Sequence, residues 1–413
     1  MRFHPSMHLT QTEGRAIGDV RKPNPMEVLK EINITSFLDR WGPAHVVQVY
    51  DTALNMQGIL VIDNTVLGPG CGGVKIAPNI TPREVYERAR SRTWSCALLD
   101  LRFGGAAAGI RANPSDVDRV QLVQAFARKV SFFVPSLFVA APDLNVEQAE
   151  MAAFAEEVGD HRGVTGKPES MHGIPYELGV VGFGMAIAIE ATLEAVGAKG
   201  GMPEGLGNAR VALHGFESVG TPLAKYIAHK GARIVALCDE GCTVHDPKGI
   251  DIESVPMRQT KSGPRAAIRE IEGVEVLPSE KLSGLECDIL VCANGRCVLH
   301  EDNVKKVKAR CVVEGLNDPI TPMARQQLFK DGVLVLPNIL ATAGGVISSY
   351  AEYNRNSSER AFSMIVSKMR DVTIEVVTGA LAQRIPPVRV AKERAKERIL
   401  ESMENDQLRE GVE

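Results

Sequence analysis

The chain has 413 residues, of which 44% are hydrophobic, so it can bury a sizeable core and its length suggests two or three domains. The 47 basic and 51 acidic residues give a formal net charge of -4 and are spread along the chain, which argues against nucleic acid as a ligand. The eight cysteines include no C-x-x-C pair, so we expect no metal or redox site, but free thiols that are buried or partly buried. No signal peptide is recognisable, and no stretch approaches the roughly 18 apolar residues of a membrane span, so we expect no membrane contact and a cytoplasmic location.

The first part of the chain predicts a small α/β unit. Residues 1–25 are polar and predict a loose lead-in, whereas the apolar spacing of 26–40 fits a helix. The β-branched runs at 46–52 and 58–65 predict two strands, and a helix at 82–99 would begin after Thr81-Pro82, where Thr81 caps and Pro82 takes the first helical position.

Glycine and apolar runs mark the elements that follow. The cluster FGGAAAG (103–109) predicts a loop in which the backbone approaches something closely, and SLFVAAPDLN (136–145) predicts a buried strand that ends in a loop. Helices are expected at 145–158 and roughly 178–196. Loops at strand ends are where α/β proteins place their chemistry.

From Arg210 onward, short apolar runs alternate with helices. The runs are RVALHGF, ARIVALCD, DILVCA, ARCVVEG and GVLVLPN, with a long connection between Asp239 and about residue 280. This alternation predicts a parallel sheet covered by helices on both faces. The chain from about 345 to 413 is predicted to be helical, and its charged run KERAKERILESMEND fits a solvated helix face.

The segment RVALHGFESVG (210–220) places a glycine turn between a predicted strand and a helix, and Asp239 ends the next strand. This context is typical of a dinucleotide site, where the glycines allow a tight turn and close approach of the pyrophosphate. The middle glycine position, however, is Glu217, whose negative charge would oppose the phosphates. Two interpretations therefore stay open: a cofactor site, in which Asp239 would favour NAD over NADP, or a strand-to-helix turn without a cofactor.

Several stretches together resemble the glutamate, leucine, phenylalanine and valine dehydrogenase family, most closely its archaeal-type glutamate dehydrogenases. They are GPGCGGVKIAP (68–78), RTWSCALLDLRFGGAAAGI (92–110), VAAPDLN (139–145), TGKP (165–168), GIPYELG (173–179), VVEGLNDPITP (312–322) and LPNILATAGGVISSYAEY (336–353). They occur in the family's order from about residue 45 to 355, which makes the match specific.

The resemblance implies an α/β fold with an N-terminal α/β substrate-type domain, a Rossmann-like domain, C-terminal helices that return to the first domain, and usually a hexamer. The expected ranges are a lead-in at 1–25, a substrate and oligomerisation domain at 26–180, an NAD(P)-binding-type domain at 181–345 and C-terminal helices at 346–413. The implied cofactor-binding residues are Gly215, Phe216, Glu217, Ser218, Val219, Gly220, Asp239 and Asn317.

The family deaminates an amino acid to a 2-oxo acid, and three lysines carry that reaction. The lysine that holds the side-chain carboxylate is replaced by Cys71, the one that holds the α-carboxylate by Ser95, and the catalytic one by Ala107. The family's proton-shuttling aspartate remains as Asp143, which also fits a plain loop or capping role.

Other family positions are partly kept. The family's arginine and cofactor-side threonine appear as Phe183 and Ile187, and the asparagine of the A-N-A-G-G motif is Thr342. Gly182, Asn317 and Ser349 fit the family pattern. The substrate cleft is therefore expected at Cys71, Ser95, Ala107, Thr342 and Ser349.

These losses predict a catalytically impaired homologue that acts as a structural or regulatory subunit, as a homo-oligomer or together with an active paralogue. One alternative is an active NAD(P)-dependent amino-acid dehydrogenase that uses Asp143 with another cation, such as Lys75 or Lys167. A second alternative is a sensor that binds a small amino acid or 2-oxo acid in the cleft without chemistry.

Overall fold

The computed structural model describes residues 38–197, 200–260 and 263–410. The chain divides into two units, 1–37 and 38–413, and all that follows concerns the second. The predicted lead-in at 1–25 and most of the predicted helix at 26–40 lie outside the described residues, while Leu38, Asp39 and Arg40 are not helical.

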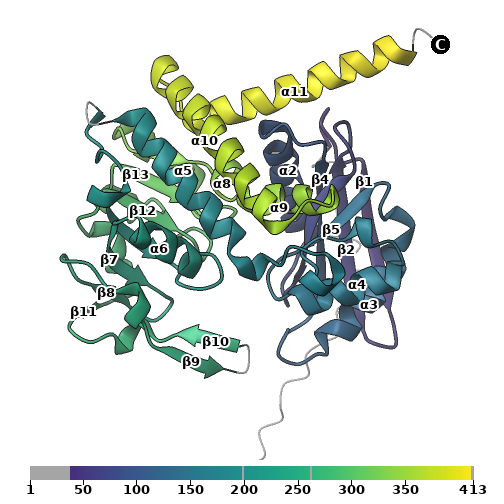
Figure 1. The fold of residues 1–413 in the computed structure, drawn as a ribbon, viewed down its shortest axis with the longest axis horizontal. Helices are drawn as coiled ribbons and strands as arrows, with labels where there is room; N and C mark the ends of the chain where they lie inside the picture. Colours follow the sequence, from purple (N-terminus) through teal and green to yellow (C-terminus); the bar gives the residue numbers. More distant parts are fainter. Residues whose placement is uncertain (1–37, 198–199, 261–262, 411–413) are drawn as a thin grey trace, which may run out of the picture. The chain divides into compact units, whose positions relative to one another are not determined.

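The first sheet contains five strands in the order β1-β2-β4-β3-β5 (Figure 1). The strands are β1 (His45–Asp51), β2 (Met56–Asn64), β3 (Gly70–Ile76), β4 (Gly104–Arg111) and β5 (Phe138–Pro142). β3 runs parallel to β4 and β5, whereas β1/β2 and β2/β4 are antiparallel. Helix α2 (Pro82–Leu98) packs on one face through Val85 and Ala89, and α3 (Arg119–Val130) and α4 (Gln148–Val158) share a core with the other face. The strands and helices predicted at 46–65, 82–99 and 136–158 are thereby confirmed.

The predicted start of α2 is also confirmed. Thr81 Oγ1 accepts a hydrogen bond of 3.1 Å from the Glu84 N–H, and Pro82 occupies the first helical position. This side chain satisfies one of the donors that a helix leaves unpaired at its N-terminus.

The loop predicted at 103–109 is wrong, because these residues form β4. Glycine disfavours strands, but here it is required by the close approach of α2: a Cβ atom on Gly105 would lie 2.2 Å from Thr93 Oγ1. The expected close approach therefore exists, but between a central strand and a helix.

The second sheet contains seven strands in the order β11-β8-β7-β6-β12-β13-β14. They are β6 (Arg210–His214), β7 (Arg233–Cys238), β8 (Thr243–His245), β11 (Glu275–Leu277), β12 (Ile289–Cys292), β13 (Cys311–Glu314) and β14 (Leu334–Leu336). The five strands from β7 to β14 are parallel, as predicted, and β8 and β11 are antiparallel. Helices α5 (Val180–Val196), α6 (Gly220–His229) and α7 (Pro322–Lys330) accompany this sheet. The strand order reverses at β6, which lies between β7 and β12. Sheets of this kind bind their ligands at the carboxyl ends of the strands, next to the point of reversal.

The long connection predicted between 239 and 280 is structured. It contains β8, β11 and a separate hairpin of β9 (Met257–Thr260) and β10 (Gly263–Ala266). Strands of three or four residues are too short to show a period of two, so the sequence pattern does not reveal them.

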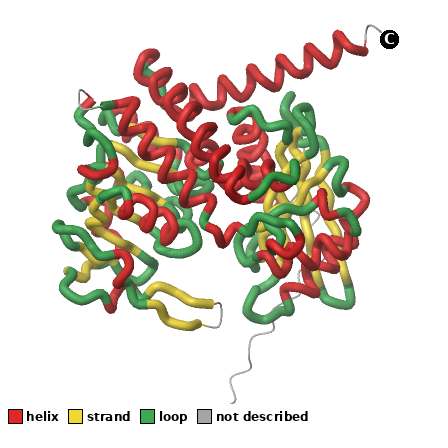
Figure 2. Tube along the Cα trace, in the orientation of Figure 1, coloured by secondary structure: helices red, strands yellow, loops and turns green. Residues whose placement is uncertain are grey.

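The C-terminal helices return to the first sheet's helix α2, as the resemblance implied (Figure 2). They are α8 (Asn338–Ala341), α9 (Gly344–Tyr353), α10 (Ser358–Gln383) and α11 (Pro387–Glu410). On α11 the small stripe Ala391, Ala395 and Ile399 is buried, while most charged side chains up to Asn405 are exposed or half-buried. The charged run is thus the solvated side of a packed helix.

The stretch Tyr176–Val196 corrects one expectation, because its length and mean hydropathy of 1.6 would suffice to cross a membrane. It contains α5, which packs against α6, α9 and α10, and 61% of its most apolar window is buried. A buried core helix passes the same composition test.

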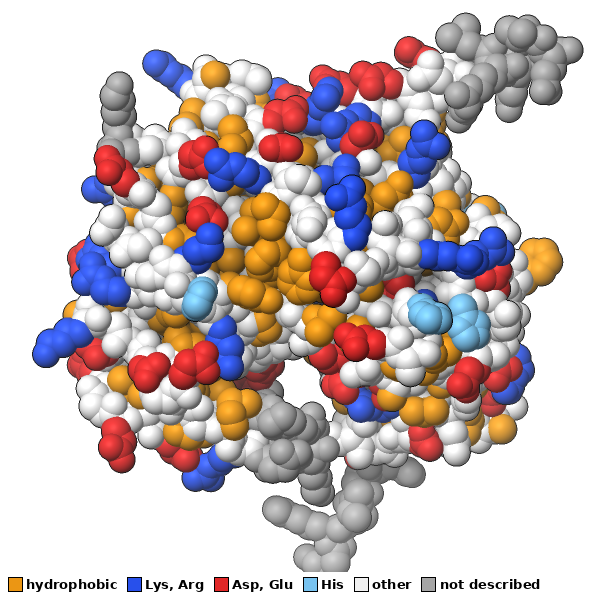
Figure 3. Space-filling model, in the orientation of Figure 1, with side chains coloured by type: hydrophobic (Ala, Val, Ile, Leu, Met, Phe, Trp, Pro, Cys, Tyr) orange, Lys and Arg blue, Asp and Glu red, His pale blue; other side chains and the backbone are white. Residues whose placement is uncertain are grey.

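On the face drawn in Figure 3, basic and acidic side chains are interspersed.

Candidate functional site

The three positions at which the resemblance places the family's lysines lie on β3, α2 and β4. Cys71, Ser95 and Ala107 are 1%, 4% and 2% exposed. Cys71 pairs with Gly105 across β3 and β4, so Cys71 and Ala107 point to the face that α2 covers. The structure therefore brings these three predicted site residues to one layer between a sheet and a helix.

None of the three side chains supplies a positive charge. Burial raises the pKa of the Cys71 thiol to about 11, although the nearby Arg92 and a hydrogen bond with Ser349 act in the opposite direction. The Ser95 hydroxyl donates a hydrogen bond of 2.8 Å to the Ile339 carbonyl, which fixes α2 against α8. Ala107 packs among apolar side chains beside Val85 and Ala89.

Asp143 follows β5 at the carboxyl end of this sheet. Its carboxylate contacts the guanidinium of Arg88, and its Oδ1 accepts a hydrogen bond of 2.7 Å from the Leu144 N–H. A Cβ atom on Gly73 would lie 2.6 Å from Asp143 Oδ2, so the glycine makes room for the carboxylate over β3. Asp143 is thus both an ion-pair partner and a loop-stabilising residue.

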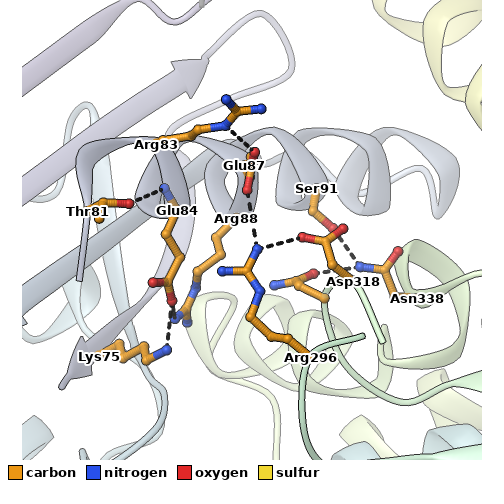
Figure 4. A network of polar contacts seen from close by, with 11 residues as sticks. Lys75, Thr81, Arg83, Glu84, Glu87, Arg88, Ser91, Arg296, Asp318 and Asn338 are labelled. Carbon is orange, nitrogen blue, oxygen red and sulfur yellow. Dashed lines mark hydrogen bonds and ion pairs between the residues drawn. The ribbon is translucent and has the colours of Figure 1, made fainter. Parts of the chain in front are cut away.

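Arg88 and Arg92 were not among the residues predicted from the sequence. They lie four residues apart on α2 and therefore on the same side of the helix. Figure 4 shows that Arg88 and Lys75 both point to Glu84, with N–O distances of 4.0 and 2.7 Å. Burial lowers the pKa of Arg88 to about 10; Glu84 opposes this effect, and Arg92 and Arg296 reinforce it. Arg88 thus keeps its charge at neutral pH.

Ser349 lies at the centre of a small hydroxyl cluster. It shares hydrogen bonds of 2.9 Å with Thr165 Oγ1 and with the Tyr176 hydroxyl, and Tyr176 also contacts the Gly345 carbonyl at 2.8 Å. Ser349 also acts on the Cys71 thiol and opposes the rise in its pKa, so the two predicted cleft residues lie near each other. Thr342, by contrast, donates to the Asn338 carbonyl of its own helix at 2.8 Å.

The two lysines considered as substitute cations are both engaged. Lys75 pairs with Glu84 on α2. Lys167 is 4% exposed and contacts Glu352 at 2.5 Å as well as the Val164 carbonyl. Glu352 also accepts the N–H groups of Gly166 and Ile174, so Lys167 belongs to a structural clamp.

The turn between β6 and α6 has the backbone of a dinucleotide-binding turn. Gly215 has φ +96°, and a Cβ atom on Gly220 would lie 1.9 Å from the Gly215 carbonyl oxygen, so both glycines are required. Phe216 is buried, Ser218 is exposed and Val219 forms the N-cap of α6 without a side-chain hydrogen bond. Glu217 is exposed in this turn and adds a carboxylate near the helix N-terminus. The backbone fits a pyrophosphate and the charge of Glu217 opposes it, so the cofactor stays a prediction.

The remaining cofactor positions already have partners. Asp239 Oδ1 accepts the N–H groups of Gly241 and Cys242 at 2.8 and 2.9 Å. Asn317 Oδ1 accepts from Asn338 Nδ2 at 2.5 Å, and Asn338 also bonds Ser91 on α2 at 3.2 Å (Figure 4).

The side chains at two further family positions on α5 pack against apolar neighbours. Phe183 contacts the rings of Tyr226 and Phe362, each with a centroid distance of 4.9 Å. Ile187 is a half-buried core residue, and a Cβ atom on Gly182 would lie 2.6 Å from the Leu223 nitrogen.

All eight cysteines are free, and seven are buried as expected, whereas Cys297 is exposed. Within the described ranges, no group of three or more His, Cys, Asp or Glu side chains is arranged to hold a metal ion.

Comparison with known proteins agrees with this architecture. The family model "Glutamate/Leucine/Phenylalanine/Valine dehydrogenase" matches residues 173–406, and "Glu/Leu/Phe/Val dehydrogenase, dimerisation domain" matches 44–160. The NADP-specific glutamate dehydrogenase of Saccharolobus shibatae is 34% identical over 323 residues, which is 74% of each chain. The glutamate dehydrogenase of Aeropyrum pernix is 34% identical over 332 residues, 76% of this chain and 77% of its own.

A solved structure extends the similarity to nearly the whole chain. The leucine-bound hetero-hexameric glutamate dehydrogenase of Thermus thermophilus is 26% identical, with a TM-score of 0.77 over 92% of this chain and 97% of its own. The sequence motifs, the two sheets and these matches show that the chain belongs to the Glu/Leu/Phe/Val family of NAD(P)-dependent amino-acid dehydrogenases.

Proposed function

We propose that this chain is a catalytically impaired member of its family that acts as a structural or regulatory subunit. The observation that carries the proposal is the pairing of Asp143 with Arg88 next to Gly73 of β3, together with the absence of charge at Cys71, Ser95 and Ala107. A carboxylate held by a guanidinium is a weak proton acceptor, since the positive partner stabilises its charged form. Asp143, which would shuttle protons, is therefore already paired with a cation. Ala107, at the position of the catalytic lysine, carries no charge.

Magnitudes support this proposal. Removal of one preorganised stabiliser of developing charge typically lowers the rate by a factor of about 10² to 10³. Hydrogen bonds to charged groups contribute on the order of 1.5–3 kcal/mol each, so loss of the two carboxylate anchors weakens substrate binding further. Replacement of the first lysine alone could adapt the site to an apolar substrate, but replacement of all three removes the reaction's cations.

Steady-state kinetics test the proposal directly. The purified chain is assayed with glutamate, leucine and other amino acids, with NAD and with NADP. We expect no turnover above the background of a mock purification. Turnover at an ordinary enzyme rate of about 1 s⁻¹ or more would refute the proposal.

The second candidate is an active oxidoreductase with altered chemistry, and the intact glycine geometry of the 215–220 turn favours it. Cofactor titration distinguishes it from the first. Because Glu217 places a negative charge at the phosphate position, we expect no saturable binding at millimolar NAD or NADP. Saturable binding, together with turnover of any amino acid, would favour this second function.

A further inference from the structure

One side of α2 carries a row of three polar side chains, Glu87, Ser91 and Ser95, at intervals of four residues. Residues four apart lie above one another on a helix, so the row faces in one direction. Exposure falls along the row, because the Glu87 side chain is 35% exposed, Ser91 is half-buried and Ser95 is 4% exposed. The row therefore leads from solvent at Glu87 into the core at Ser95.

The two serines of this row are bonded to α8, which follows the last strand of the second sheet. Ser95 donates to the Ile339 carbonyl at 2.8 Å, and Ser91 Oγ accepts from Asn338 Nδ2 at 3.2 Å (Figure 4). The bond at Ser95 is buried, whereas the bond at Ser91 lies closer to solvent. The contact between α2 and the second sheet's side of the molecule is thus firmest at Ser95.

Arg296 supplies the contact at the exposed end of the row. Its Nη2 lies 3.7 Å from Glu87 Oε2 on α2 and 3.2 Å from Asp318 Oδ2, which follows β13 (Figure 4). The Arg296 side chain is 56% exposed, so water screens both ion pairs. When the contact with Glu87 breaks, Arg296 keeps Asp318 and Glu87 keeps Arg83 at 2.9 Å. The contact can therefore break without leaving a charge unpaired.

The loop that carries Arg296 is tied to the second sheet. The Cys297 backbone is left-handed, with φ +53°, and its N–H donates to the Asp318 carbonyl at 3.0 Å. At the start of the loop, the Asn294 carbonyl contacts Nδ1 of His214, the last residue of β6, at 2.9 Å. The loop after β12 and the ends of β6 and β13 thus form one unit, which meets α2 through Arg296.

We propose that Arg296 is a charge-dependent latch, which holds the loop after β12 against α2 through Glu87 and releases it without any ligand. Release begins at Glu87, where the contact is exposed, while the buried bond at Ser95 persists. Because an exposed ion pair stabilises only weakly, it shifts the ratio of closed to open molecules by about two- to fivefold. The latch needs neither a substrate nor catalysis, so it is independent of the proposed function.

Energy transfer within the full chain measures the distance between this loop and α2. Cys297 is exposed and the other seven cysteines are buried, so an iodoacetamide naphthalene-sulfonate dye labels the loop. The chain's two tryptophans are the donors: Trp94 lies on α2, and the Trp41 ring contacts it with a centroid distance of 5.5 Å. Time-resolved tryptophan fluorescence then separates quenched, closed molecules from open ones, and labelled Cys297→Ser gives the background.

The latch predicts how charge controls this ratio. Arg296→Gln should raise the ratio of open to closed molecules by about two- to fivefold. Glu87→Gln should have the same effect, and the double variant should be no more open than either single variant, since both remove one contact. An increase in NaCl from about 0.1 M to about 1 M shortens the screening length from about 10 Å to about 3 Å. It should open the unmodified chain and leave Arg296→Gln unchanged.

Arg83→Gln is the matched control, because it removes the other arginine that pairs with Glu87 and leaves both charges of the latch in place. It should not open the loop. Equal ratios in Arg296→Gln and the unmodified chain, additive effects of the two latch variants, or a salt effect that persists in Arg296→Gln would overturn the latch. Opening by Arg83→Gln as large as that by Arg296→Gln would also overturn it. If Arg296→Gln does not fold, Glu87→Gln and the salt titration of the unmodified chain decide the matter.

Discussion

Arg88 and Arg92 place two positive charges on one side of α2, next to a sheet whose own cation positions are Cys71 and Ala107. Arg88 neutralises Asp143, which the resemblance places at the position of the family's proton-shuttling aspartate. The uncharged residues at the lysine positions and the pairing of Arg88 with Asp143 therefore support the same proposal, because both oppose the family's proton-transfer chemistry.

A restoration series tests this reading at single residues. The variant Cys71→Lys, Ser95→Lys, Ala107→Lys and Glu217→Gly is expected to remain nearly inactive, because Arg88 still pairs with Asp143. Addition of Arg88→Met should raise the rate of glutamate deamination by at least about tenfold, since it frees the carboxylate next to the new lysine at position 107. The rate is measured from the absorbance of reduced cofactor.

The control for that series replaces Arg88→Met by Arg83→Met, which removes a charge from the exposed side of α2. It should not raise the rate. Full activity of the fourfold variant, with Arg88 in place, would contradict the role assigned to the Arg88–Asp143 pair.

The sequence located the three lysine positions and Asp143 through motifs, and the structure brings Cys71, Ser95 and Ala107 together. It did not point to Arg88 and Arg92, because arginines on a helix with many charges are usually solvated. Their spacing of four residues was the available signal, yet that spacing alone does not show that the shared side faces the sheet. Their importance depends on the packing of α2 against β3 and β4.

Among the elements, the long and strongly patterned ones were predicted and the short or glycine-rich ones were not. The helices α2 and α5 and the strands β2, β6 and β7 have caps or apolar runs that predict them. The sequence predicts a loop where strand β4 lies, because the glycines of β4 serve a tertiary contact with α2, which no local pattern contains. Strands β8 and β11 have three residues each and pair across 29 intervening residues, from 246 to 274.

The end of α2 depends on the C-terminal helix α11. Arg398 donates hydrogen bonds to the carbonyls of Ala97 and Leu98 at 3.0 and 2.6 Å, in the last turn of α2, where carbonyls lack helical partners. Arg398→Met should lower the free energy of unfolding by about 1–2 kcal/mol, because these charge-assisted bonds are lost. Urea unfolding at one fixed protein concentration measures the change.

Arg389→Met on the same helix is the matched control. Arg389 forms an exposed i,i+4 pair with Glu393, and such a pair contributes about 0.5 kcal/mol or less. Equal effects of the two substitutions would show that Arg398 acts through the general helicity of α11 and not through α2.

At the scale of the whole molecule, the fold is that of the family, whereas the resemblance places Cys71, Ser95 and Ala107 at the family's lysine positions. The glycines at 73, 105, 215 and 220 stand where close packing or a tight turn requires them. A framework that folds with these close contacts in place is what the proposed structural role requires. The strand β1 fits this proposal: within the described part of the chain it is an edge strand of its sheet, it contains no lysine or proline, and its Tyr50 side chain is exposed.

We therefore expect the tagged chain to co-purify with a lysine-bearing family member when the two are co-expressed, and native mass spectrometry should find both in one oligomer. The hetero-hexameric relative makes such a mixed assembly a reasonable expectation. Tyr50→Lys on β1 should reduce the mixed oligomer, because an exposed edge lysine disfavours strand addition. Ala53→Lys, in the exposed turn between β1 and β2, adds the same charge away from the edge and should leave assembly intact. Recovery of the chain alone, with the partner present in excess, would leave no role for it as a subunit of a mixed enzyme.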